Sequence, residues 1–233
     1  MLNSALTYVD LLRGPTGGLT ASWDPEITVR VGDYGRVTQG QRNWIFFWRK
    51  NGTRFLKEGN IYTDGKAAEH GIPEPIENGG DSEGEAWVTS ENATRIDASL
   101  FGGTLAQCEV KGAFKFSSGR GAVLAQKNTM ITSIEAPAAL KRVLEDPSMR
   151  GFCIVSEVHS CSAYARWLTT IRGGAIALGL RIEPSGFASV GATATWVKSA
   201  TSGNFKSHVN KSGERLFYPL YRLVSLSEEG TLT

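Results

Sequence analysis

The sequence predicts an α+β protein that is mostly β, with a few helices. Apolar and small residues alternate with polar ones over much of Phe152–Val197, with period two. The aromatic run Gln41–Lys50 is followed by Asn-Gly at 51–52, the strongest local signal for a β-hairpin. A second pair of alternating stretches, Ala86–Asp97 and Thr104–Phe116, flanks a glycine-containing turn. These patterns are typical of antiparallel sheets.

The first third of the chain predicts one helix, three strands and one irregular segment. Leu2–Arg13 has apolar residues at helical spacing, and Gly14-Pro15 ends it. Glu26–Val31 alternates as a strand, and Arg54–Tyr62 is expected as the strand that returns from the aromatic run. Gly71–Glu85 is rich in proline, glycine and acid, so we expect it to lack regular structure.

The later part of the chain adds a helix and a closing strand. Pro137–Asp146 begins with proline, which favours a helix start. Its Leu140, Val143 and Leu144 fall on one face. Leu216–Leu226 is an apolar strand, and its internal proline favours a sheet edge or a bulge.

Phe152–Val197 reads as a hairpin that is long for a domain of this size. Trp196 shares one strand face with four smaller residues, and threonine, serine and glycine occupy the other face. One face could therefore meet lipid and the other water. The expected turn region, Ile171–Ile182, is too short for a spanning helix. The alternative is an ordinary edge hairpin with one solvated face. The small apolar residues are Ala188, Val190, Ala192 and Ala194.

Bulk composition is that of a globular protein, with 233 residues, 41% of them hydrophobic and 21% charged. The net charge of +2 is distributed as +3 over residues 1–66, −8 over 67–110 and +7 over 111–233. The two flanking regions could build a basic surface, although a solvated surface of mixed sign has the same composition. We expect one domain, 1–233.

The chain opens without the pattern of a secretory signal, so a cytosolic location is expected. Cys108, Cys153 and Cys161 are odd in number and lack metal spacing, which favours free thiols. Cys153 and Cys161 lie near His159, but the three residues form no recognised metal motif.

No catalytic motif is evident, so an enzyme is the weaker hypothesis, and no cofactor or metal is expected. The three histidines are isolated from nucleophiles, and neither dinucleotide nor phosphate-loop glycine motifs occur. The run Trp44–Lys50 could stack bases, but the sequence pI near 8.4 argues against nucleic acid as a partner.

Several segments, in order, resemble the pore-forming amino-terminal domain of the gasdermins. They are the first helix Leu2–Arg13, FFWRKNGTRFLKEGNIYTDG (Phe46–Gly65), MITSIEAPAALKRVLEDPSMRGFCIVSEVHS (Met130–Ser160) and GERLFYPLYRLVSL (Gly213–Leu226). The similarity covers nearly the whole chain and rests on order rather than on an invariant signature. Most animal members carry a carboxy-terminal repressor, and nothing of that kind follows Glu228-Glu229. The chain is therefore expected to be either a cleaved product or a short member without a repressor, and it is most similar to short members such as the fungal regulators of cell death.

The resemblance implies a twisted antiparallel sheet with peripheral helices that converts to a transmembrane β-barrel when subunits form a ring. The two inserting hairpins would match Ala86–Phe116 and Phe152–Val197. Acidic inner-leaflet phospholipids are the implied partners, together with further copies of the chain or an allelic variant. The implied lipid-binding residues are Arg13, Arg42, Arg49, Lys50 and Arg54. The implied membrane anchors are Trp44, Phe46, Phe47 and Trp48. The implied inserting residues are Ile176, Leu178, Leu180, Val190, Ala192, Ala194 and Trp196.

The leading hypothesis is a cell-death effector that is cytoplasmic until it binds acidic phospholipids, oligomerises and permeabilises the plasma membrane. A strand pair can enter hydrocarbon only when every backbone polar group is paired, so ring closure would be part of the mechanism. The rival hypothesis is a β-rich module that binds a ligand or a protein and has no membrane activity. For the aromatic residues, burial in a core strand is the competing role.

Overall fold

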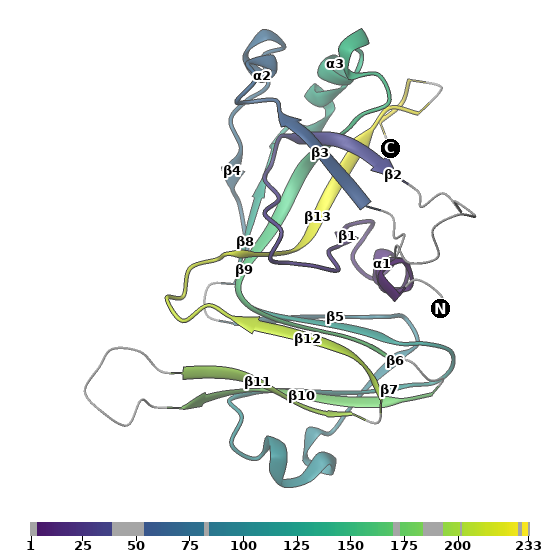
Figure 1. Ribbon diagram of the computed structural model, residues 1–233, viewed down its shortest axis with the longest axis vertical. Coiled ribbons are helices and arrows are strands. Elements are labelled where there is room, and N and C mark those ends of the chain that lie inside the picture. Colours follow the sequence, from purple (N-terminus) through teal and green to yellow (C-terminus); the bar gives the residue numbers. More distant parts are fainter. Residues whose placement is uncertain are drawn as a thin grey trace, which may run out of the picture.

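The computed structural model describes residues 4–38, 54–81, 84–169, 173–183, 193–200, 202–227 and 230–232. Within them the fold is mostly β, and all pairings between its strands are antiparallel. The strands form a nine-stranded sheet and a four-stranded sheet. Figure 1 shows the smaller sheet stacked beneath the lower half of the larger one. The predicted α+β class with antiparallel sheets is confirmed.

The central strand of the larger sheet is β9 (Cys153–Thr169), which is 17 residues long. One of its edges pairs first with β13 (Phe217–Ser225) and then with β12 (Gly203–Val209). The other edge pairs with β2 (Asp33–Thr38) and then with β8 (Ala122–Ser133). Nearly every β9 residue is buried, so both faces are covered. A strand of this kind shows no clean alternation in its sequence.

Short strands complete the larger sheet. β1 (Thr20–Ala21) pairs with β13. The predicted strand Arg54–Tyr62 is present as β3 (Arg54–Asn60), but it pairs with β2, and the aromatic run from which it was expected to return lies outside the described residues. β4 (Ile76–Glu77) and β5 (Glu85–Thr89) pair with β8. Apart from β4, the described part of the predicted irregular segment has no helix or strand before its last residue, Glu85.

The closing strand is confirmed as β13. Its register against β9 shifts between Phe217 and Leu220, at the position of Pro219. The bulge that the proline favours is therefore present. Proline lacks the N–H that a regular ladder requires, which explains the shift.

The helices are short and lie at the periphery. α1 (Ser4–Arg13) ends where Gly14-Pro15 was expected to stop it. α2 (Lys66–Glu69) and α3 (Leu140–Leu144) lie together at the top of Figure 1. None of the described helices has the length and apolar character that a bilayer crossing needs.

The predicted helix Pro137–Asp146 is confirmed in its core. A 3-10 turn, η2 (Pro137–Ala139), leads into α3, and a second one, η3 (Pro147–Met149), follows. The three residues assigned to one face, Leu140, Val143 and Leu144, are all buried.

The four-stranded sheet runs in the order β11-β10-β7-β6. Its strands are β6 (Ala93–Ile96), β7 (Val110–Phe116), β10 (Ala175–Glu183) and β11 (Thr193–Ala200). One face packs on the larger sheet, where Phe116 of β7 contacts Trp167 of β9 at 5.5 Å between ring centroids. The other face carries η1 (Ala98–Leu105), which Figure 1 shows below the sheet.

The strand predicted over Glu26–Val31 is wrong. Ile27 donates its N–H to Asp24 in a turn and is 52% exposed, whereas Val29 and Val31 are buried. Gly32 has a φ of 84°, a left-handed conformation that no regular strand continues through. The alternation over Glu26–Val31 reflects burial of Val29 and Val31 in irregular chain, and the strand β2 begins only after this segment.

The predicted long hairpin Phe152–Val197 is also wrong as one unit. Its expected turn region, Ile171–Ile182, contains most of strand β10, which pairs with β11 along eight residue pairs. The upstream arm is β9, and it belongs to the other sheet. The true connection in this hairpin, residues 184–192, lies outside the described residues.

The predicted arm Ala86–Asp97 divides into two strands in different sheets. β5 pairs with β8, and β6 pairs with β7. Between them the chain turns at Ser90, whose carbonyl accepts the N–H of Ala93 and whose hydroxyl accepts the N–H of Ala122. The hairpin predicted over Ala86–Phe116 is therefore confirmed only for its inner part, β6 and β7.

Packing between the sheets predicts a large contrast between two identical substitutions. Leu178 is fully buried between the sheets, so Leu178→Ala should lower the free energy of unfolding by about 2–5 kcal/mol. Leu100 in η1 is 75% exposed, and Leu100→Ala should change it by about 0.5 kcal/mol or less. Urea denaturation of both variants measures the difference. Equal losses would show that the two sheets do not pack as described.

Candidate functional site

Two hairpins lie side by side in the four-stranded sheet. The first is β6–β7, with η1 in its connection, and the second is β10–β11. They are joined by antiparallel pairing of β7 with β10, from Ala175 opposite Lys115 to Leu180 opposite Val110. Residues separated by 60 to 70 positions in the chain are thus paired in one continuous sheet.

The two faces of this sheet differ in chemistry. The strand register places the large apolar side chains on the face that packs against the larger sheet. Their members with described side chains are Phe114, Phe116, Ile176, Leu178, Leu180 and Trp196. The opposite face has mostly small, polar or charged residues at the alternate positions, Lys111, Ala113, Lys115, Ala177, Gly179, Arg181, Thr195 and Ser199. It also carries the apolar Ile96 and Val197, and the apolar face carries the charged Arg95 and Lys198. Alternation of this kind is typical of strands in membrane barrels.

Helix η1 covers the small residues on that opposite face. Leu105 and Cys108 cluster with Ala113 and Ala177 in a separate small core. A Cβ on Gly179 would lie 2.6 Å from the Cys108 sulfur, so glycine is required for this close approach. The sheet is thus covered by apolar contacts on both faces.

The predicted inserting residues take one face where they are described. Ile176, Leu178, Leu180 and Trp196 are buried in the core between the sheets, and Ala194 is half-buried beside them. Val190 and Ala192 lie outside the described residues.

Little of the predicted docking surface can be placed. Arg13 is exposed at the end of α1, and Arg54 begins β3. In Figure 1, α1 and the ends of β2 and β3 that flank residues 39–53 lie on the same side of the view. The other predicted docking and anchor residues, Arg42, Arg49, Lys50, Trp44, Phe46, Phe47 and Trp48, lie outside the described residues.

A short segment, residues 22–26, contacts side chains of β9 and β12 in the larger sheet, and we call it the strap. The Trp23 ring lies under the guanidinium of Arg166, 3.5 Å from it, and meets the Tyr8 ring of α1 edge-on at 5.4 Å. Arg166 is only 3% exposed. The strap therefore connects α1 to the strand β9 through a cation–π contact.

Glu26 of the strap accepts hydrogen bonds from Lys206 Nζ and the Tyr164 hydroxyl, and its carboxylate lies 3.1 Å from His208 Nε2. Lys206 Nζ also lies 3.2 Å from Asp24. Partial burial opposes ionisation of Glu26, but the bonds from Lys206 and Tyr164 outweigh it and hold its pKa below the ordinary value. The strap carboxylates are thus anchored to β9 and β12.

Sequence reasoning missed this group because its members are far apart in the chain. Glu26 and Lys206 are separated by 180 positions, and Glu26 and Tyr164 by 138. Only the pairing of β12 with β9 brings Lys206 beside Arg166 and His208 beside Tyr164. No local motif signals such an arrangement.

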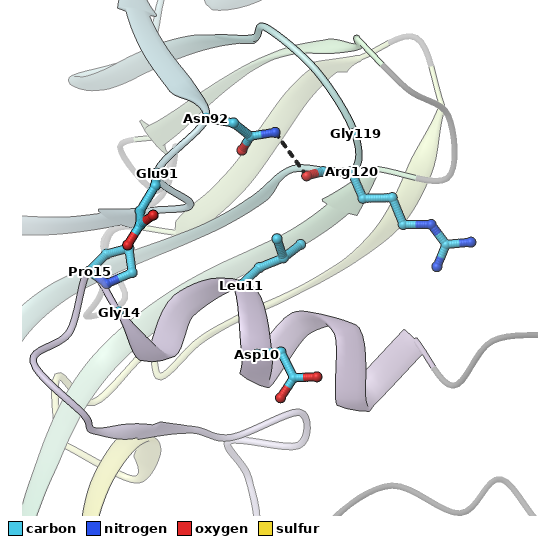
Figure 2. Close-up of a pocket in the computed structure, with 8 residues that line it drawn as sticks. All are labelled: Asp10, Leu11, Gly14, Pro15, Glu91, Asn92, Gly119 and Arg120. Carbon is cyan, nitrogen blue, oxygen red and sulfur yellow. Dashed lines mark hydrogen bonds between the residues drawn. The ribbon is translucent and has the colours of Figure 1, made fainter.

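A cavity of about 380 Å³ lies between the end of α1 and two turns of the β-strands. Figure 2 shows Leu11 directed into this space and the Asp10 carboxylate directed away from it. The Asn92 amide donates to the Arg120 carbonyl at 3.1 Å, which leaves less of it for a ligand. Gly14, Pro15, Glu91 and Gly119 complete the lining. The volume is at the low end for ligand sites, and the charged groups do not converge.

The three cysteines are free and buried. Burial raises the pKa of Cys153 to about 11 and that of Cys161 to about 12, so both thiols are protonated at neutral pH. His159 lies 2.7 Å from Glu157 rather than beside a thiol. Among the described residues no cluster of metal-ligating side chains occurs.

In comparisons with known proteins, the sequence matches no family and no curated protein. Its function is therefore inferred from its own geometry and chemistry.

The strap carboxylate predicts a pH-dependent contribution to stability. Because the folded pKa of Glu26 is lowered, its contribution is complete above the unfolded value, about 4.3, and is lost as pH falls through the folded value. Glu26→Gln should lower the free energy of unfolding by about 1–2 kcal/mol at pH 7, and the difference should shrink as pH falls through the lowered pKa of Glu26. Denaturant titrations from pH 3 to about 7 measure it. Glu135→Gln, at an exposed position, is the control and should show no such trend.

Proposed function

We propose that this protein forms pores in membranes, as a cell-death effector that acts from the cytosolic side of the plasma membrane. It would bind acidic phospholipids, assemble with further copies into a ring and contribute two hairpins to a β-barrel. The observation that carries the proposal is the four-stranded sheet, in which the two hairpins are neighbours, with large apolar side chains on one face and mostly small or polar ones on the other.

The strand lengths are compatible with a barrel. A transmembrane strand needs about nine to eleven residues, and β10 has nine. β7 and β11 have seven and eight, and β6 has four. The alternation over Thr104–Phe116 begins six residues before β7, so β7 could lengthen when η1 unwinds.

The sheet also has two edges through which it could be extended. Within the described residues, no strand pairs with the outer edge of β6 or of β11. An unpaired edge is intolerable in hydrocarbon, because each unsatisfied backbone group costs several kcal/mol. Pairing β6 of one copy with β11 of the next would remove both edges, and repetition around a ring would close the barrel.

The apolar face is covered in the monomer, which accounts for a latent form. Ile176, Leu178 and Leu180 would exchange contacts with the larger sheet for contacts with lipid chains. Because both surroundings are apolar, this exchange costs little hydrophobic free energy. The costs that remain are separation of the sheets and release of η1.

The rival function, a binding module without membrane activity, would use the cavity beside α1. That cavity offers Glu91 and Asn92 as polar contacts. It gives no role to the amphipathic hairpins, and so we favour the pore. Dye release from cardiolipin- or phosphoinositide-containing vesicles separates the two, because a module should leave vesicles of every composition sealed.

Two neighbouring positions on β11 test which face meets lipid. Ala194 lies on the apolar face and Thr195 on the polar face. Ala194→Asp should leave vesicle binding intact and strongly reduce leakage, because a charge facing the bilayer interior costs up to a few kcal/mol per subunit. Thr195→Asp, the matched control, should retain leakage. Melting temperatures establish that both variants are folded, and equal leakage from both would contradict the assigned faces.

The predicted docking residues are tested by charge reversal. Arg49, Lys50 and Arg54 changed together to Glu should abolish sedimentation with acidic vesicles, since each basic side chain near such a surface contributes about 1 kcal/mol. The melting temperature should not fall.

The matched control for this reversal changes the same number of charges elsewhere. Lys141, Arg142 and Arg150 are exposed in and after α3, and their reversal to Glu should leave most of the sedimentation intact. If the control loses binding to the same extent, the attraction is a property of net charge and not of the predicted docking segment.

A further inference from the structure

Four side chains form a compact group on the face of the larger sheet that the strap covers. Arg166 pairs in register with Lys206, and Tyr164 pairs with His208, so the four occupy adjacent positions on β9 and β12. We call them the polar quartet. Its members are donors, and up to three of them are cationic.

The strap provides the quartet with an anion. The Glu26 carboxylate is contacted by Lys206, Tyr164 and His208 together. An ammonium, a hydroxyl and an imidazole converge here on two carboxylate oxygens. The same donors would suit a phosphate group equally well, because a phosphate, like a carboxylate, presents charged oxygens that accept hydrogen bonds. The quartet is therefore an anion site that the chain fills with its own side chain.

The strap satisfies this site incompletely. Arg166 is 3% exposed, yet within the described residues no carboxylate forms an ion pair with it, and its one side-chain hydrogen bond goes to Asn204 at 3.2 Å. Its Nε has no partner there, and neither has the Tyr8 hydroxyl, which is fully buried. The Asp24 and Glu26 carboxylates of the strap act on this guanidinium only through space and not by direct contact, so an anion that contacts it directly would be favourable.

The strap has few backbone bonds to the sheet, although its Pro25 is buried and its Trp23 packs against the α1 core. It has irregular backbone, follows a strand of two residues and is fixed to β13 by the N–H of Ser22 on Pro219 and the N–H of Tyr218 on Pro25. The side chains of Asp24 and Glu26 are 48% and 32% exposed. Segments with few ladder bonds and exposed side chains open at low cost.

We propose that the polar quartet is a binding site for the phosphate of anionic phospholipid headgroups, and that Glu26 competes for it as an internal ligand. Headgroup binding and displacement of the strap are then one equilibrium. Because Trp23 of the strap contacts Tyr8, displacement also loosens α1 from the sheet. The inference rests on the proposed function for its lipid surface, but it concerns binding and not the pore.

The test removes the competing anion without changing the quartet. Glu26→Gln should bind phosphatidylcholine vesicles containing a phosphoinositide about fivefold more tightly than the unmodified chain, as measured by sedimentation. Neutral phosphatidylcholine vesicles should show no gain. Adding Lys206→Ala to Glu26→Gln should abolish the gain. Asp24→Asn weakens only one contact of Lys206, so its gain in vesicle binding should be smaller. This variant replaces Glu26→Gln in the test if Glu26→Gln is poorly folded.

Glu157→Gln is the matched control, because Glu157 is also a half-buried carboxylate held by a histidine and a basic side chain, His159 and Arg222, but it lies outside the quartet. An equal gain in this variant would overturn the proposal, since only net charge would then matter. Inorganic phosphate that binds Glu26→Gln without any vesicle gain would also overturn it, in favour of a soluble ligand. If Glu26→Gln shows the gain in vesicle binding but no dye leaks from the vesicles, the result would contradict the proposed pore and not the headgroup site.

Discussion

The structure depends on one contact, the packing of the apolar face of the four-stranded sheet against the larger sheet. Six large side chains from three strands meet there, and each contributes about 1.5–3 kcal/mol when buried. Their sum is comparable to the whole stability of an ordinary domain. Among the described strands no ladder of hydrogen bonds joins the two sheets, so this apolar contact, with the chain connections, holds them together. A contact of this kind is non-directional, and lipid could replace one partner.

The sequence predicts much of the fold where the signals are local. Pro137 and the spacing of Leu140, Val143 and Leu144 define a helix, and Pro219 places a bulge in β13. The strand over Glu26–Val31 could not be distinguished from irregular chain, because burial of Val29 and Val31 produces the same period as a ladder. The left-handed conformation of Gly32 shows that this segment is not a strand, and its only sign in the sequence is the glycine itself.

The larger errors have a common cause in the topology. β9 is buried on both faces, so its sequence lacks alternation. The sequence pattern predicts one hairpin of β9 with β11, although the two strands lie in different sheets. The glycines before β10 made a strand resemble a turn. For the site, the apolar parity of Ala194 and Trp196 was predictable from period two, whereas the strap and the quartet depend on residues more than a hundred positions apart.

The long strand β9 determines which surface of the larger sheet would be exposed if the two hairpins separated from it. Ala163, Ala165 and Trp167 of β9, with Val123 and Ala125 of β8, line the floor on which the hairpin sheet rests. Removal of that sheet would expose a flat apolar surface with an indole at its centre, on a strand too firmly paired to fold over and hide it. Exposed apolar surfaces of this kind associate with one another in water. A subunit that opened in isolation would therefore be prone to aggregation, and in the proposed pore, opening would be productive only where other subunits already lie in the same bilayer.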